Sequence, residues 1–134
     1  EGECYILELT GRAGANTLPE IVSAYYSVDY YGVVAKIALG ERVAPTLFKS
    51  GKKAVLGKML FVSEESRVLF SWKKETADCV TDLRYFMENG DIAHPFQSLK
   101  DCFGQIVVEG NDVEQCRYLL DTQFDLSFKL NSVI

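Results

Sequence analysis

The feature that most constrains this chain is a series of short runs in which apolar and polar residues alternate. In residues 122–130, phenylalanine and leucine occupy every second position from Phe124 to Leu130. Alternation with a period of two residues is typical of a β-strand with one buried face. Alternation or enrichment in β-branched and aromatic residues predicts strands in seven further stretches: 5–10, 33–39, 54–62, 67–73, 79–87, 105–109 and 113–120.

Turn residues separate these runs at short intervals. Asn-Gly at positions 89–90 and Gly-Asn at positions 110–111 supply residues that tolerate a positive φ. The second pair predicts a hairpin between residues 105–109 and 113–120. Regular short strands with turns between them are typical of antiparallel barrels and sandwiches. The sequence therefore predicts one mainly β domain over residues 1–134, an antiparallel β-barrel or curved sandwich with one or two short helices.

Two segments have helical signals. Residues 17–20, Thr-Leu-Pro-Glu, match the capping-box pattern with an early proline and predict a helix over residues 18–26. The valine and tyrosine residues in that stretch also suit a strand. Phe96, Leu99 and Phe103 have the spacing of one apolar stripe and predict a second, short helix.

The cysteines favour an exported protein. The chain has an even number of them without a C-x-x-C pair, and its single histidine excludes the usual zinc-site patterns. Scattered cysteines in even number predict two disulfides, an oxidising compartment and a secreted protein without a bound metal. Four buried free thiols in a cytosolic protein are the alternative. The cysteines are Cys4, Cys79, Cys102 and Cys116.

Charge is distributed unevenly around a net value of −5. Residues 36–58 contain six basic residues and one acid, whereas residues 75–125 contain eleven acids and three bases. An acidic domain is poorly suited to nucleic acid, because phosphate contacts need clustered basic residues. The acidic half favours a basic surface on any protein partner. No apolar run approaches the roughly 18 residues of a membrane helix, so no membrane span is expected.

Catalytic patterns are lacking in the sequence. His94 is the only histidine, and no serine lies in a G-x-S-x-G motif. Asp121 and Asp125 would share the polar face of a strand, which favours exposure over acid–base work. No glycine-rich phosphate loop is present. The sequence therefore predicts a protein that is not an enzyme, with no catalytic residue and no cofactor.

A tyrosine cluster is the strongest candidate for a binding site. Four of the seven tyrosines lie between Tyr25 and Tyr31, and tyrosine is enriched where proteins contact other molecules. If this segment is a strand, Tyr25, Asp29 and Tyr31 share one face. That face could bind a small apolar or cationic ligand, with ring faces adding cation–π attraction, or a protein partner. Alternatively, the tyrosines are core residues of a half-buried strand.

These observations predict a secreted, non-enzymatic binding protein. It would bind a small apolar or amine ligand, or a protein partner, through the tyrosine-rich surface. The alternative is a secreted inhibitor or immune-modulating interaction protein that acts by steric occlusion. Large inward side chains would fill a small barrel and favour the protein partner, whereas a wide apolar cavity would favour the small ligand.

Overall fold

A computed structural model describes residue 5 and residues 14–49, 53–70 and 78–132, except the side chains of residues 70 and 123–132. Three α-helices occur in this part of the chain: α1 (Leu18–Tyr26), α2 (Tyr30–Ala38) and α3 (Val113–Ser127). The strands are β1 (Ala54–Leu60), β2 (Ser66–Phe70), β3 (Val80–Tyr85), β4 (Ile92–Ala93), β5 (Gly104–Gly110) and β6 (Phe128–Ser132). Short 3₁₀ helices lie at η1 (Pro45–Leu47) and η2 (Leu99–Asp101).

The central sheet has the strand order β1-β5-β3, and both pairings are antiparallel. Gly57 of β1 and Asp82 of β3 both lie opposite Val107 of β5. The register of β3 shifts by a bulge between Val80 and Asp82. The run from Ile106 to Val108 is buried throughout, as expected for a strand with neighbours on both edges and cover on both faces.

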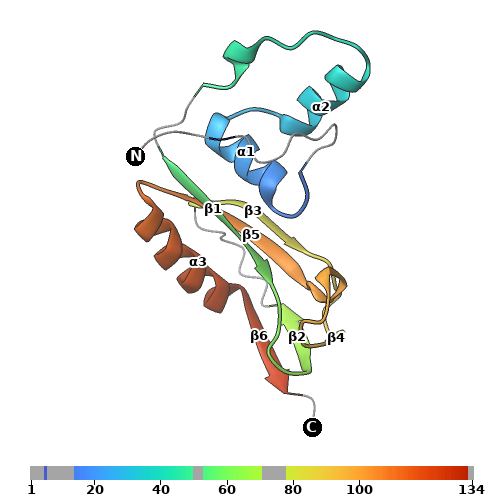
Figure 1. Ribbon diagram of the computed structural model, residues 1–134. Helices are drawn as coiled ribbons and strands as arrows, with labels where there is room; N and C mark the ends of the chain where they lie inside the picture. Colours follow the sequence, from blue (N-terminus) through green and yellow to red (C-terminus); the bar gives the residue numbers. More distant parts are fainter. Residues whose placement is uncertain (1–4, 6–13, 50–52, 71–77, 133–134) are drawn as a thin grey trace.

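Helices cover the two faces of this sheet, as Figure 1 shows for α1 and α3. On the α3 face, Ile106 and Val108 pack with Cys116 and Leu120 in the main hydrophobic core. On the other face, α1 approaches β1 at Gly57. A Cβ atom there would lie 2.7 Å from Thr17 Oγ1, so the missing side chain permits this close packing.

A second sheet has the strand order β4-β2-β6. Val68 of β2 and Ala93 of β4 are fully buried and belong to the same hydrophobic core as the central sheet. Strand β6 follows α3 directly and pairs with β2, so that Leu130 lies opposite Val68. Figure 1 shows this smaller sheet beyond the end of the central sheet that is farther from α2.

The predicted mainly β barrel or sandwich is wrong. The structure is a small α/β fold with two open sheets, and neither sheet closes into a barrel in the described ranges. The helices supply the cover that a second sheet would give in a sandwich. Two of the stretches predicted as strands of such a barrel, residues 33–39 and 113–120, are mostly or wholly helical.

Helix α3 was missed because its apolar residues fit both the two-residue alternation of a strand and the spacing of a helix. Cys116 and Leu120 are four residues apart and both buried, whereas Tyr118 between them is 68% exposed. The predicted hairpin turn instead starts this helix, since Asp112 Oδ1 accepts a hydrogen bond of 2.7 Å from the Gln115 amide. The predicted strand over residues 122–130 is therefore divided between the end of α3 and β6.

Several other predictions can be compared with the structure. The helix over residues 18–26 is confirmed, and β1, β3 and β5 lie in or overlap the stretches predicted as strands. Strand β2 covers the first part of residues 67–73, and most of residues 5–10 lies outside the described residues. The helix expected around Phe96 is wrong. That segment forms only the 3₁₀ turn η2, in which Ser98 and Asp101 make a capping box.

The burial of two phenylalanines gives a direct test of this core. Phe103 is fully buried in the core, whereas Phe96 is 58% exposed and contacts Phe61 edge-on. We expect Phe103→Ala to lower the free energy of unfolding by about 3–5 kcal/mol, because it leaves a cavity. The matched Phe96→Ala variant should lose less than about 1 kcal/mol. Denaturant unfolding measures both, and equal losses would contradict the core described here.

Candidate functional site

A chain of polar side chains crosses the α1 face of the central sheet. Gln105 Nε2 donates to Asp82 Oδ2 at 2.7 Å, and Asp82 Oδ1 accepts from Arg84 Nε at 3.0 Å. Arg84 also pairs with Glu20 Oε1 at 3.2 Å, and the Tyr31 hydroxyl donates to the same oxygen at 2.8 Å. We call these five residues the Glu20 network. It ties α1 and α2 to strands β3 and β5.

Glu20 is the most unusual member of this network. Its side chain is 7% exposed, and its Oε2 atom is buried without a hydrogen-bond partner in the structure as described. The capping-box pattern would have turned this acid toward the start of α1, yet Thr17 makes no side-chain cap in the described structure. A buried, unpaired carboxylate oxygen is costly because it has lost its hydration.

The network changes the ionisation of two of its members. The hydrogen bond to Glu20, followed by burial and the charge of Glu20, raises the pKa of Tyr31, and Arg84 opposes this only in part. Burial alone would lower the pKa of Arg84, but the charges of Asp82 and Glu20 outweigh burial and raise it. Arg84 is therefore a guanidinium cation and Tyr31 a neutral phenol at ordinary pH.

A hollow of about 330 Å³ opens beside the Glu20 network. Its walls include Glu20, Tyr31, Asp82 and Arg84, together with the small polar residues Ser23 and Thr81. Two carboxylates and one guanidinium leave one negative charge in excess when both acids are ionised. The hollow thus offers hydrogen-bond acceptors and, when both acids are ionised, a net negative charge.

A second hollow, of about 530 Å³, lies between α2 and the segment that follows it. Lys36, Arg42 and Lys49 line it with a single acid, Glu41, so three of the six basic residues in the stretch 36–58 lie around this hollow. Leu47 gives part of its wall an apolar surface.

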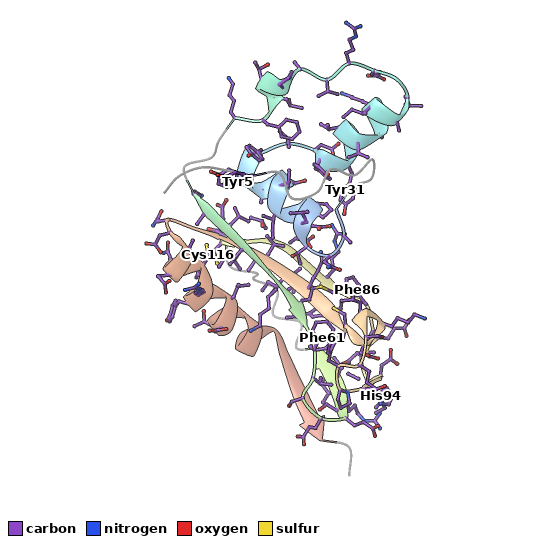
Figure 2. The ribbon with its side chains drawn as sticks, in the orientation of Figure 1. Tyr5, Tyr31, Phe61, Phe86, His94 and Cys116 are labelled. Atoms are coloured by element: carbon purple, nitrogen blue, oxygen red, sulfur yellow. The ribbon has the colours of Figure 1, made fainter. Side chains whose placement is uncertain are left out.

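The structure separates the three predicted binding residues. They do not share a strand face, because Tyr25 lies in α1, Asp29 precedes α2 and Tyr31 lies in α2. Tyr25 packs edge-on against Tyr26 with ring centres 4.9 Å apart. Asp29 caps α2 by accepting a hydrogen bond of 2.9 Å from the Gly32 amide. Tyr31 alone joins the Glu20 network, and Figure 2 shows its position.

The predicted pair of disulfides is wrong. Two disulfides would use all four cysteines, but Cys79, Cys102 and Cys116 are free thiols, and Cys4 lies outside the described residues. Burial, followed by the charge of Asp112, raises the pKa of the Cys116 thiol (Figure 2). The sequence argument for a secreted protein therefore loses its main support.

Other classes of site have little support in the described residues. His94 is exposed and lies 3.0 Å from Glu65 Oε2 through its Nδ1 atom, which places it in a surface pair (Figure 2). No group of three or more histidine, cysteine, aspartate or glutamate side chains is placed to hold a metal within the described ranges. None of the helices seen there has the length and apolar character needed to cross a bilayer.

Two solved structures resemble this chain. Phosphoribosylglycinamide synthetase from Anaerococcus prevotii superposes with a TM-score of 0.77 and 32% identity over 96% of this chain and 34% of its own. L-amino acid ligase from Bacillus licheniformis has a TM-score of 0.65 and 14% identity over 88% of this chain and 30% of its own. Both are ligases with the ATP-grasp fold. No protein-family model and no curated protein matches the chain.

These likenesses overturn the functional prediction. The chain spans about a third of the length of the two solved structures, and both are enzymes. The predictions of a non-enzymatic binding protein and of a steric inhibitor are therefore wrong, as is the exclusion of an enzymatic role. Secretion itself stays a prediction. Those predictions were based on the absence of catalytic motifs from the sequence. However, functional residues that the fold brings together need not form a sequence motif.

Sequence analysis missed four of the five network members: Glu20, Asp82, Arg84 and Gln105. Asp82 and Arg84 are two residues apart in a predicted strand, so the sequence does place them on one face. An opposite-charge pair on one strand face is a weak signal, because most such pairs are exposed. The decisive fact is that α1 covers this face, and the sequence does not show which helix packs there.

The contact between Tyr31 and Glu20 predicts a measurable titration. Tyr31 should ionise above the ordinary value of about 10, and Glu20→Gln should lower its pKa because the hydrogen bond to a carboxylate is lost. Because the pKa of Tyr31 is higher in the folded than in the unfolded state, neutral Tyr31 stabilises the fold. This stabilisation is complete below the unfolded pKa and is lost as pH rises through the folded pKa. Carbon-13 NMR of the tyrosine rings, assigned with Tyr31→Phe, measures the titration.

Glu114→Gln is the matched control, because Glu114 is an exposed acid of α3 outside the network. It should leave the Tyr31 titration unchanged. An unchanged Tyr31 pKa in Glu20→Gln would show that the two side chains are not in contact in solution.

Proposed function

We propose that these 134 residues form part of an ATP-dependent ligase. The observation that carries the proposal is the likeness to phosphoribosylglycinamide synthetase, which extends over 96% of the chain at 32% identity. A TM-score of 0.77 over that length supports a shared fold. The second neighbour, at 14% identity, supports the fold alone.

The proposed substrate class follows from the name of the neighbour at 32% identity, which is a phosphoribosylglycinamide synthetase. We therefore propose a reaction in which ATP drives the joining of two substrates, one of which has an amino-acid portion. Because this chain matches only about a third of each neighbour, the ATP and substrate contacts would be shared with further parts of a longer protein.

Within such an enzyme, the described residues supply a well-packed structural element. Strand β5 is enclosed by two strands and two helices, which suits a scaffold that positions loops and neighbouring segments. The fold alone does not assign a reaction, so the proposal rests on its extensive likeness to a ligase and is open to direct assay.

The proposal predicts amino-acid-dependent ATP consumption. The longest native protein that contains this chain should consume ATP when supplied with a mixture of amino acids and small carboxylates, and mass spectrometry should detect a joined product. Omission of the amino acids is the first control. Gly104→Val is the second, because a Cβ atom at this position would lie 2.7 Å from the Arg84 carbonyl oxygen and disrupt the central sheet. Turnover that persists in Gly104→Val would come from a contaminant.

ATP consumption that does not depend on any amino acid, with no joined product, would contradict the proposal. So would a purified native protein that consumes no ATP under these conditions while its circular dichroism shows that it is folded.

A further inference from the structure

The hollow of about 530 Å³ between α2 and the segment that follows it has a charge opposite to that of the whole chain. The chain has a net charge of −5. Three cations, Lys36, Arg42 and Lys49, line this hollow against one acid, Glu41, which leaves an excess of two positive charges. Figure 1 shows α2 and this segment on the side of α1 that faces away from the central sheet. A local excess of this sign in an acidic chain favours an anion.

The charged side chains around this hollow are accessible to a ligand. Lys36, Arg42 and Lys49 are exposed, as is Glu41. None of the four makes an ion pair with another of the described residues. The three basic side chains can therefore turn toward an anion in the hollow without giving up an ion pair of that kind.

One feature of the hollow acts against an anion. Helix α2 ends at Ala38, and the carbonyl end of a helix carries a partial negative charge equivalent to about half an elementary charge. Backbone amides of residues 39–41 donate to the carbonyl oxygens of Ala35, Lys36 and Ile37, so these three oxygens already have partners. The helix end is thus outweighed by the excess of two positive charges on the side chains.

The hollow also has an apolar wall. Val33 lines it and is 6% exposed, whereas Leu47 lines it and is 45% exposed. Val43 and Ala44 extend the same lining. An inorganic anion would leave the surface of Leu47 in water, but an organic anion with an apolar group would cover it and gain from its burial. The volume of the hollow is within the range of small-ligand sites.

We propose that this hollow binds a small phosphate monoester that carries an apolar group. A phosphate monoester has about 1.5 to 2 negative charges on one group at pH 7, which matches the excess charge of the hollow. The guanidinium of Arg42 can bind two phosphate oxygens at once, and the two lysines add point charges. Thr46 also lines the space, and Leu47 supplies surface for the apolar group. The site is separate from the Glu20 network and does not depend on the proposed ligase activity.

The first test compares three ligands that separate charge from apolar surface. Phenyl phosphate has both, inorganic phosphate has the charge alone, and benzyl alcohol has the ring alone. Each is titrated into the protein at pH 7 and constant ionic strength, without ATP, and amide signals are followed by NMR. We expect saturable shifts around Lys36, Arg42 and Leu47 with phenyl phosphate at millimolar concentration. Inorganic phosphate should bind at least about threefold more weakly and benzyl alcohol at least about tenfold more weakly.

The second test changes the charge of the hollow in both directions. Lys36→Gln combined with Arg42→Gln removes the excess of two positive charges, and phenyl phosphate should then bind at least about tenfold more weakly. The matched control combines Lys100→Gln with Arg117→Gln, which changes the charge of the protein equally at exposed residues outside the hollow. Its affinity should stay unchanged. Glu41→Gln removes the acid of the hollow and should tighten binding about twofold.

Four results would overturn the proposal: no saturation with phenyl phosphate, equal affinity for inorganic phosphate, equal weakening in the two double variants, or no tightening in Glu41→Gln. All the substituted residues are exposed, and circular dichroism checks that each variant is folded. If the double variant of the hollow does not fold, the comparison of the three ligands and Glu41→Gln decide. Because no ATP is present, this result is separate from success or failure of the ligase assay.

Discussion

The enclosure of strand β5 is the constraint on which the rest of the structure depends. Strands β1 and β3 pair with its two edges, while α3 and α1 cover its two faces. Because both faces are buried, Gln105 must find a hydrogen-bond partner on the α1 side, and it finds Asp82. Asp82 orients Arg84, and Arg84 contacts Glu20. The polar network is thus a consequence of placing a polar residue in a strand that is covered on both faces.

Part of this fold can be predicted from local sequence. The proline and threonine before Glu20 mark the start of α1, and the run from Ile106 to Val108 indicates a buried strand. Helices α2 and α3 were misread because β-branched and aromatic residues in them favour strands locally, and tertiary packing overrides that preference. In α3, the same residues fit a period of two and the spacing of a helix, and only burial distinguishes Cys116 from Tyr118.

The candidate site was less predictable than the fold, because it is formed by segments far apart in the chain. The tyrosine cluster led to Tyr31, but its partner Glu20 has the sequence position of an exposed helix-capping acid. Its burial requires β3 to present Arg84 on the face that α1 covers. The prediction of two disulfides failed for a related reason. Cys102 and Cys116 are small buried core residues, and an even number of cysteines does not determine whether they pair. Likewise, a chain that resembles a third of two ligases need not contain a complete reaction motif.

Amide hydrogen exchange, read residue by residue, tests the central position of β5 most directly. A strand paired on both edges has every amide in a ladder, whereas an edge strand has only alternate amides bonded. We therefore expect slow exchange at successive amides from Gln105 to Glu109, and alternating slow and fast exchange along β1 and β3. Alternating exchange along β5, or successive protection along both β1 and β3 as in a closed barrel, would contradict the open sheet and the network that depends on it.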